Sequence, residues 1–479
     1  MYLGLDLGTS SLKGIIIDDE QRLIASAKAS LDVSRPHPGW SEQDPASWIS
    51  AADNVLSELS SQVEMAAVRG IGLSGHMHGA TALDADNKVL WPCILWNDTR
   101  SAVQARAMDE DPAFRAITGN IVFPGFTAPK IEWLRQEHPE IFAKVAKVLL
   151  PKDFLRLWLT GEHVAEMSDA AGTSWFDTGA RDWSDTLLAN CHLTREQMPR
   201  LVEGSQSSGN VRPEIADRFR FQANIPVAGG GGDNAASAIG VGVVKAGQAF
   251  VSLGTSGVLF AANDKYRPDP DTAVHTFCHA VPDTWHQMGV ILAASDALTW
   301  YSKLVDEDAA SLTNGLGPLQ TPGNAVFLPY LGGERTPLND AAIRGAFLGL
   351  EHATDRQAGT RAVLEGVTFA LKDCQQALAA TGTQLDSLIA VGGGSASDYW
   401  LSAIATALGC QIDLPQDGEL GAAFGAARLG MMAATGAGAE IATQPLMAGR
   451  VEPNVSLSAA FEDGYARYVK ARDAIAALS

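Results

Sequence analysis

The chain has 479 residues, which is enough for two or three domains that each bury a core of their own. With 46% hydrophobic and 19% charged residues, its composition is that of a folded globular protein and not of a disordered one. The net charge of −20 argues against a surface that binds nucleic acid or an anionic membrane, because such polyanions would be repelled. It does not argue against a nucleotide, whose phosphates can be met locally by backbone N–H groups and a metal ion.

The cysteines and the N-terminal residues indicate a reducing compartment. The five cysteines are far apart, odd in number and form no CxxC pair, so we expect neither a disulfide framework nor a structural zinc site. The first apolar stretch begins at Tyr2 and is interrupted by Asp6, which does not fit a signal peptide. The region nearest to a membrane span, residues 235–262, contains Lys245 and several glycines and predicts a buried helix followed by a buried strand. We therefore expect a cytoplasmic protein without membrane contact.

The first half of the chain alternates strand and helix patterns. Residues 2–27 predict a β-hairpin and a third strand, and a helix is expected to begin near Pro45 after a proline-rich loop. A further strand is expected at 68–75, a strand-turn-strand at 81–90 with its turn at 84–88, helices around 127–145 and 152–159, and a strand at 224–228 that ends in four glycines. A helix with Asp233 or Asn234 at its N-terminus follows.

The pattern restarts at Gly247 with a second hairpin. A helix at 354–381, a strand at 387–391, a helix at 397–408, a strand at 410–415, a small-residue helix within 418–434 and a final helix from 458 to the end are expected after it. The layout therefore predicts two layered α/β halves of comparable size, residues 1–243 and 244–479.

Both halves open on the same four letters, LGTS, between two apolar strands. Thr9 and Thr255 hold the same place in the two turns, and Gly8 and Gly254 let the backbone approach an anion closely. Two such turns that face each other across a cleft would clamp one polyphosphate with backbone N–H groups and hydroxyls, including that of Ser10. The alternative is a pair of unrelated hairpins, because Gly-Thr-Ser is a common turn composition.

Two charged residues flank the first turn. Asp6 ends the first strand among apolar neighbours, where a carboxylate must be solvated, paired or bound to a metal. It would either face Mg²⁺, through water, or accept hydrogen bonds from the N–H groups of the turn. Lys13, on the return strand, either reaches a phosphate or points to solvent.

The four glycines before Asp233 are more than a helix cap requires. Asp233 is a candidate general base that takes a proton from a substrate hydroxyl, since the helix N-terminus keeps its carboxylate ionised and the glycines admit a substrate. The simpler interpretation, a helix N-cap, is compatible with this role.

The stretch SGHMHGAT, residues 74–81, surrounds its histidines with small residues. His78 is a candidate hydrogen-bond partner for a substrate hydroxyl, although a histidine satisfied within a turn is the commoner case. A zinc site is not expected, because HxH lacks a third ligand nearby.

Glycines also follow a strand in IAVGGGSASDYW, residues 389–400. A dinucleotide-binding unit needs GxGxxG, and Ser397 stands where its third glycine would be. We interpret Gly392, Gly393 and Gly394 as the floor of an adenosine site. No GxxxxGK[ST] motif occurs, which excludes a P-loop kinase or ATPase.

These stretches together resemble the FGGY carbohydrate kinases. DLGTSSLK, GWSEQDP, GHMHG, WNDTR, GGGGDNAA, SLGTSG, GERTP and VGGGSASDYW follow in the expected order over nearly the whole chain. GFTAPKIEWL, and GAFLGL followed by RAVLEG, look like the two signatures of the family. MHGAT, PKDFLRLWLTG and MSDAAGTSWFD are most similar to its branch of bacterial D-xylulose kinases.

The resemblance implies an actin/Hsp70-like ATPase fold with two ribonuclease-H-like domains flanking a catalytic cleft. It implies transfer of the γ-phosphate of Mg-ATP to the terminal 5-hydroxyl of D-xylulose, with closure of the two domains. A homodimer is expected from the resemblance alone. The residues it assigns are Asp233 as base, Met77, His78, Asp233 and Asn234 around the sugar, Asp6 and Asp233 near Mg²⁺, and Thr9, Ser10, Lys13, Gly254, Thr255 and Gly392 to Gly394 around ATP.

Two alternatives stay open. The chain departs from many D-xylulose kinases at His76, where glutamine is common, so the acceptor could be another ketose, a polyol such as xylitol or glycerol, or gluconate. A nucleotide-driven chaperone or filament protein could share the fold. The lack of a substrate-binding domain after the last helix and the small polar pocket of GHMHG argue against this second alternative.

Overall fold

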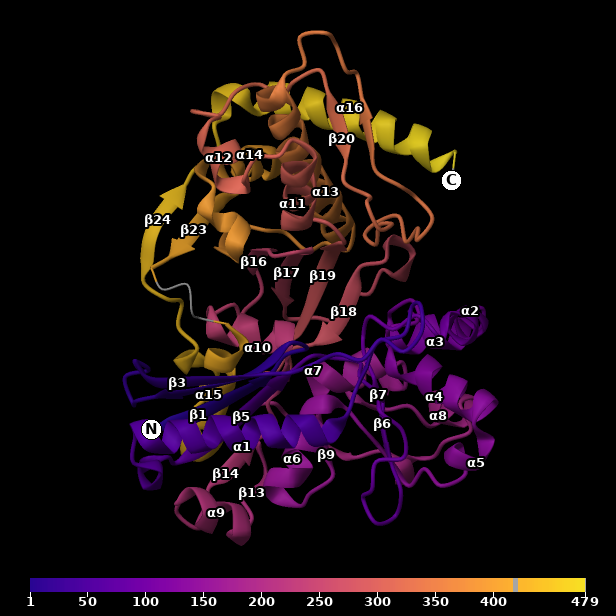
Figure 1. The fold of residues 1–479 in the computed structure, drawn as a ribbon, viewed down its shortest axis with the longest axis vertical. Helices are drawn as coiled ribbons and strands as arrows, with labels where there is room; N and C mark the ends of the chain where they lie inside the picture. The colour runs from indigo at the N-terminus through magenta and orange to yellow at the C-terminus, as the bar shows by residue number, and fades with distance from the viewer. Residues whose placement is uncertain (417–420, 479) are drawn as a thin grey trace.

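The computed structural model describes residues 1–416 and 421–478. In this part of the chain two seven-stranded sheets, one in each half, form the centre of the molecule, with the first sheet below the second in Figure 1. The expected division at residue 243 lies between helix α10 and strand β16, and it stays a prediction.

The first sheet has the strand order β13-β14-β5-β1-β2-β3, with β15 paired to β5. β1, β2 and β3 are antiparallel neighbours, whereas β5 runs parallel to β1 and to β15. The strands are β1 Tyr2–Leu7, β2 Ser11–Ile17, β3 Leu23–Ser30, β5 Gly70–Gly75, β13 Ser207–Asn210, β14 Pro226–Ala228 and β15 Gly231–Gly232.

The second sheet has the order β18-β19-β17-β16-β22-β23-β24 and repeats the hairpin and parallel neighbour of the first. β16 pairs antiparallel with β17 and parallel with β22. The strands are β16 Gln248–Leu253, β17 Gly257–Asn263, β18 His275–Cys278, β19 Trp285–Ile291, β22 Ser387–Val391, β23 Gln411–Pro415 and β24 Met447–Val451.

Helices cover the faces of both sheets. Short two-stranded pairs lie outside these two sheets. The helices are α1 Pro45–Gln62, α2 Ala102–Asp109, α3 Pro112–Thr118, α4 Thr127–Glu137, α5 Pro139–Phe142, α6 Pro151–Thr160, α7 Met167–Ala170, α8 Asp185–Asn190, α9 Pro213–Phe219, α10 Asp233–Gly240, α11 Ser295–Leu304, α12 Ala309–Asn314, α13 Arg356–Ala380, α14 Asp398–Leu408, α15 Ala422–Thr435 and α16 Ser458–Ala476. The short pairs are β4 Glu42–Gln43 with β7 Cys93–Ile94, β6 Thr81–Leu83 with β8 Lys147–Leu149, β9 Val164–Glu166 with β12 Arg200–Val202, β10 Phe176–Asp177 with β11 Asp182–Trp183, and β20 Val326–Leu328 with β21 Ala346–Leu348. Among the described residues, no helix is long and apolar enough to cross a membrane.

Helix α15 comes from the second half of the chain but packs on the first sheet (Figure 1). Its backbone lies so close to β5 that a Cβ on Gly72 would stand 1.7 Å from the carbonyl oxygen of Ala426. On its other side, a Cβ on Gly425 would stand 1.7 Å from the carbonyl oxygen of Ala236 in α10. The small residues of this helix thus allow a close contact between the two halves of the chain.

Strand β1 shows how the sheet presents its two faces. Leu3, Leu5 and Leu7 pack into the core with α1, whereas Tyr2 packs with Ala423 and Phe424 of α15 on the opposite face. Because side chains alternate along a strand, Asp6 is on the α15 face.

Most expected elements are present, and one expected helix is divided in two. The helical pattern of 127–145 divides into α4 and α5 at His138, because Pro139 has no N–H to continue the helix. The first three residues of the expected small-residue helix, 418–420, and the last residue of the final helix, 479, lie outside the described residues.

Candidate active site

The first LGTS turn is held by side chains from two other segments. The N–H of Gly8 donates to the carbonyl of Ser11 at 3.0 Å, which closes the β1–β2 hairpin. Trp96 Nε1 donates to Thr9 Oγ1 at 3.0 Å, and Gln43 Nε2 donates to the carbonyl of Thr9 at 2.7 Å. Ser10 is exposed beside these contacts. The backbone of the turn is therefore fixed, while the Ser10 side chain is accessible to solvent.

The second LGTS turn lies against the N-terminus of α11. The carbonyls of Gly254 and Thr255 accept hydrogen bonds from the N–H groups of Ser295 and Ala294, at 2.9 and 2.8 Å. The second turn is therefore held by the backbone at the start of a helix, whereas the first turn is held by side chains.

The glycines after β22 reach the second turn. Gly392 has a φ of +91°, which favours glycine, and a Cβ there would stand 2.9 Å from the carbonyl carbon of Leu253 and 3.2 Å from the nitrogen of Gly254. A Cβ on Gly394 would meet the Leu253 side chain at 2.8 Å, whereas Gly393 faces open space. Two of the predicted nucleotide motifs therefore touch.

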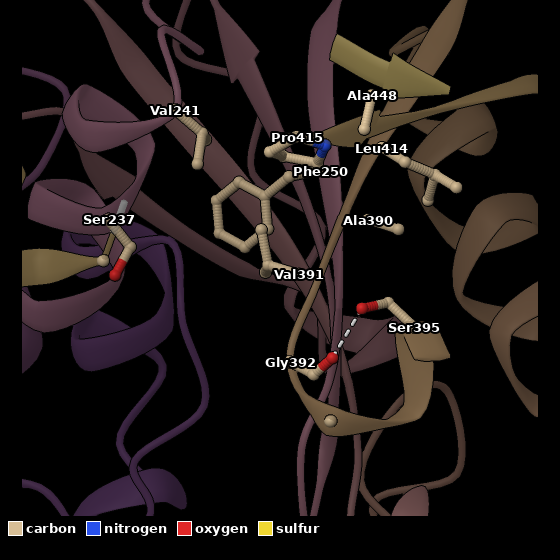
Figure 2. Close-up of a pocket in the computed structure, with 12 residues that line it drawn as sticks. Ser237, Val241, Phe250, Ala390, Val391, Gly392, Ser395, Leu414, Pro415 and Ala448 are labelled. Carbon is tan, nitrogen blue, oxygen red and sulfur yellow. Dashed lines mark hydrogen bonds between the residues drawn. The ribbon is translucent and has the colours of Figure 1, made fainter. Parts of the chain in front are cut away.

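A mainly apolar pocket of about 660 Å³ opens beside these glycines (Figure 2). Its size suits a small organic ligand. It is lined by Ser237, Val241, Phe250, Ala390, Val391, Gly392, Gly393, Ser395, Leu414, Pro415, Gly421 and Ala448.

Helix α10 connects this pocket to the candidate base. Asp233, Ser237 and Val241 are spaced by four residues and therefore share one face of the helix. Ser237 and the C-cap residue Val241 line the pocket, and at 1.5 Å per residue Asp233 begins the helix about 6 Å before Ser237 and about 12 Å before Val241. A nucleotide in the pocket would thus have room for its phosphates along this face.

Asp233 is the first residue of α10, and Gly232 is its cap. Its Oδ1 accepts hydrogen bonds from the backbone N–H of Asn234 at 2.7 Å and from Asn234 Nδ2 at 3.0 Å. Burial, and then the negative charge of Asp6, raise the pKa of Asp233 to about 6. Such a carboxylate is ionised at neutral pH and is still a usable base.

Asp6 lies at the same edge of the first sheet as Asp233. Asp6 pairs with Ser74 of β5, and the next residues of β5 and β15, Gly75 and Gly232, pair immediately before Asp233. Burial raises the pKa of Asp6, although the neighbouring Ser74 side chain and the charge of Lys13 oppose the rise. Lys13 is opposite Asp6 in the β1–β2 register.

The two carboxylates fit a magnesium ion that is shared with a ligand. Asp6 Oδ1 is buried and has no hydrogen-bond partner in the described part of the chain. No cluster of three or more histidine, cysteine, aspartate or glutamate side chains able to hold a metal is found there. Mg²⁺ is commonly bound by one or two carboxylates, with phosphates and waters completing its shell.

Met77 lies next to the last glycine before Asp233, and His78 follows it in the chain. A Cβ on Gly232 would stand 2.8 Å from Met77 Cγ, whereas His78 packs against another segment, where a Cβ on Gly172 would stand 2.5 Å from its ring. His78 Nδ1 is 2.7 Å from the carbonyl oxygen of Gly172, which can only accept a hydrogen bond, so Nδ1 carries the proton. Burial lowers the pKa of His78 to about 3, so its Nε2 carries no proton and can accept a hydrogen bond.

Helix α4 holds the backbone of His78, a contact that the sequence did not predict. His78 has a φ of +70°, and its carbonyl accepts hydrogen bonds from Lys130 Nζ at 2.8 Å and Thr127 Oγ1 at 3.1 Å. Burial lowers the pKa of Lys130 to about 7. Both residues belong to the stretch GFTAPKIEWL. In the sequence this stretch served as a family signature, but no role was assigned to its residues.

His76 packs against one of the residues that hold the first LGTS turn in place. Its ring is 3% exposed and packs edge-on against Trp48, with 5.8 Å between ring centroids. Trp48 Nε1 in turn donates to Gln43, which holds Thr9. Burial lowers the pKa of His76 to about 3.

Comparisons with known proteins decide the family. The N-terminal domain of the FGGY family of carbohydrate kinases matches residues 1–240, and the C-terminal domain of the same family matches residues 249–434. The chain belongs to the FGGY family of carbohydrate kinases. This confirms the predicted resemblance and argues for a kinase over a chaperone or filament protein.

Relatives within the FGGY family cover almost the whole chain. The xylulose kinase of Escherichia coli K12 is 47% identical over 437 residues, which are 91% of this chain and 90% of that protein. The crystal structure of a "xyloylose kinase from Brucella ovis" is 60% identical, covers both chains completely and has a TM-score of 0.99.

A more distant FGGY structure shows the shared fold. Glycerol kinase from Plasmodium falciparum with ADP is 20% identical, with a TM-score of 0.90 over 99% of this chain and 97% of that one. The predicted actin/Hsp70-like fold is confirmed. As an FGGY kinase, the protein uses ATP and a carbohydrate substrate.

Proposed function

We propose that this protein transfers the γ-phosphoryl group of ATP to the terminal 5-hydroxyl of D-xylulose, giving D-xylulose 5-phosphate. One observation carries the proposal: Asp233 follows Gly232, which packs against Met77, and it begins the helix from which Ser237 lines the apolar pocket. An acceptor hydroxyl and a nucleotide would therefore meet at Asp233. The choice of D-xylulose rests on the names of the relatives at 47% and 60% identity.

The chain's own residues have distinct tasks in this reaction. Asp233 orients the 5-hydroxyl and accepts its proton as the oxygen attacks the γ-phosphorus, and Asn234 and His78 hold the sugar through hydrogen bonds. The N-terminus of α10 stabilises the ionised carboxylate. The backbone N–H groups and hydroxyls of the two LGTS turns, with Lys13, hold the phosphates, and Gly392 to Gly394 border the adenosine.

Mg²⁺ belongs to the same proposal. Asp6 and Asp233 would hold it, and when bound it neutralises charge on the phosphates of ATP. The buried, unpartnered Oδ1 of Asp6 supports this assignment.

We also propose the larger arrangement that the sequence suggested. Residues 1–243 carry the sugar site and the base, residues 244–479 carry the adenosine site, and closure between them excludes water as a competing acceptor. A cytoplasmic location is supported by five cysteines that are all free and buried. A homodimer is proposed on family resemblance.

The test is ADP release from Mg-ATP with D-xylulose, L-xylulose, D-ribulose, L-ribulose, xylitol, glycerol and D-gluconate as acceptors. We expect selective turnover of D-xylulose. Selective turnover of another acceptor would support kinase activity but assign a different substrate. Slow hydrolysis that no acceptor stimulates would contradict the proposal.

A further inference from the structure

A cluster of five ionisable side chains lies beneath the glycine segment, residues 228–232, that leads to Asp233. Lys152 Nζ is 2.9 Å from the carboxylates of Asp153 and Asp169 and 3.3 Å from that of Glu166. Burying so many charges is costly unless every charge is paired. The members, all 0% exposed, are Lys152, Asp153, Arg156, Glu166 and Asp169.

The cluster sets two cationic side chains against three carboxyl groups. Burial raises the pKa of Asp169, and the nearby carboxylates of Asp153 and Glu166 add to the rise, whereas the ion pair with Lys152 opposes it. A fully buried group that is held together by ion pairs can serve as a rigid support.

Arg156 joins this cluster to the start of the glycine segment. Its Nη1 donates to the carbonyl of Ala228 at 2.6 Å, and its Nη2 donates to the carbonyl of Gly229 at 2.5 Å. The same guanidinium contacts Asp153 at 3.3 Å within the cluster. The planar fork of an arginine holds two successive carbonyls in a rigid geometry, which the single ammonium group of a lysine does not reproduce.

Ser168 joins the cluster to the end of the same segment. The carboxylate of Glu166 accepts hydrogen bonds from the N–H of Ser168 at 2.7 Å and from its Oγ at 3.0 Å. With its proton directed at Glu166, Ser168 Oγ accepts a hydrogen bond from the N–H of Gly232 at 3.0 Å. This contact is one residue before Asp233.

We propose that Arg156 and Ser168 are positioning residues that hold the glycine segment, and through it the Asp233 carboxylate, in the orientation that phosphoryl transfer needs. The proposal rests on the proposed function of Asp233. Neither side chain touches a substrate, so each acts only through the backbone that it holds. Small displacements of a reacting group can lower a rate by up to about 100-fold.

The test compares Ser168→Ala and Arg156→Lys with a matched control. Thr368→Val removes another fully buried hydroxyl, which donates to the carbonyl of Leu364 at 2.7 Å in α13. Amide hydrogen exchange of the ligand-free proteins reports on residues 228–234, and kcat and KM are measured with D-xylulose. A thermal unfolding midpoint for each variant identifies any general loss of stability.

We expect Ser168→Ala to speed exchange in residues 228–234 and to lower kcat roughly 10- to 100-fold, with the sugar KM within about twofold. Arg156→Lys should do the same at residues 228–230, and the control should change neither. Unchanged exchange in both variants, or faster exchange with an unchanged kcat, would overturn the proposal. If the wild-type protein turns over no sugar, the proposed function fails, while the exchange data still decide whether these residues hold the segment.

Discussion

At the scale of single residues, the strongest prediction concerns Asp233. Asp233→Ala should lower kcat by roughly 10²- to 10⁴-fold without unfolding the protein, because the acceptor hydroxyl loses its base. In the wild type the pKa of Asp233 is about 6, and only the ionised form accepts a proton. kcat/KM should therefore fall as the pH drops below about 6. Normal turnover in the variant would exclude Asp233 as the base.

Asp6 should govern the use of Mg-ATP more than the binding of sugar. Asp6→Ala removes a buried carboxylate whose Oδ1 has no other partner among the described residues. Loss of such a charged contact corresponds to roughly a 10- to 100-fold higher requirement for Mg²⁺. A Mg²⁺ titration at saturating ATP measures it, with the sugar KM as control. An unchanged Mg²⁺ dependence would contradict the assignment.

The sequence predicts residues that carry unusual local patterns, and it misses those that act at a distance. Four glycines mark Asp233, and small neighbours mark His78. Lys130 acts on the carbonyl of His78 from 52 positions away, and Ser168 acts on Gly232 from 64 positions away. No spacing along the chain encodes such contacts, because only the packed tertiary structure brings the two partners together.

At the scale of elements, α4 is predicted to shape the sugar site by holding His78. Lys130→Met keeps the length of the side chain and removes the donor to the His78 carbonyl, which sits in a left-handed backbone conformation. Loss of one such hydrogen bond, about 1 kcal/mol, should raise the sugar KM several-fold while the ATP KM stays constant. Steady-state kinetics with each substrate varied in turn would measure both. An equal rise in the two KM values would indicate a general distortion instead.

The contact between α15 and the first sheet should tolerate no side chain at Gly72. A methyl group there would overlap the carbonyl oxygen of Ala426, so Gly72→Ala must displace the helix. We expect the free energy of unfolding to fall by about 1–3 kcal/mol or more, measured by chemical denaturation. Gly332→Ala is the matched control, because a Cβ there meets nothing within 4 Å. Equal stability of the two variants would show that the contact adapts.

Element types were predictable from the sequence, but the partners of those elements were not. The hairpins, the glycine turns and α10 follow from apolar periodicity and capping residues. The run of small residues in α15 indicates close packing, yet it does not say against which sheet. The close approach of Gly72 and Gly425 to other backbones appears only when both halves have folded.

At the scale of the whole molecule, one hydrophobic core joins the two halves. Phe123 and Phe126 from the first half pack with Phe277 and Met288 of the second sheet. Buried histidines lie in and around this core. Burial lowers the pKa of His279 to about 4 and the pKa of His286 well below its ordinary value of 6.5.

These neutral histidines predict that acid weakens the folded state. When a pKa is lower in the folded than in the unfolded protein, the unfolded chain binds the extra proton, so stability present above pH 6.5 is lost as the pH falls. At pH 5 one such histidine costs about 2 kcal/mol relative to pH 8. His286→Phe removes this cost and keeps an aromatic ring stacked on Phe260, whose centroid lies 4.5 Å from that of His286.

The variant should therefore lose about 2 kcal/mol less unfolding free energy than the wild type between pH 8 and pH 5. Urea unfolding at each pH measures the difference, and the comparison is within each protein, so a constant packing effect cancels. Parallel pH dependence in the two proteins would mean that His286 can be protonated in the folded state. The predicted difference instead requires this core, which both halves build, to stay closed to a proton until the whole molecule unfolds.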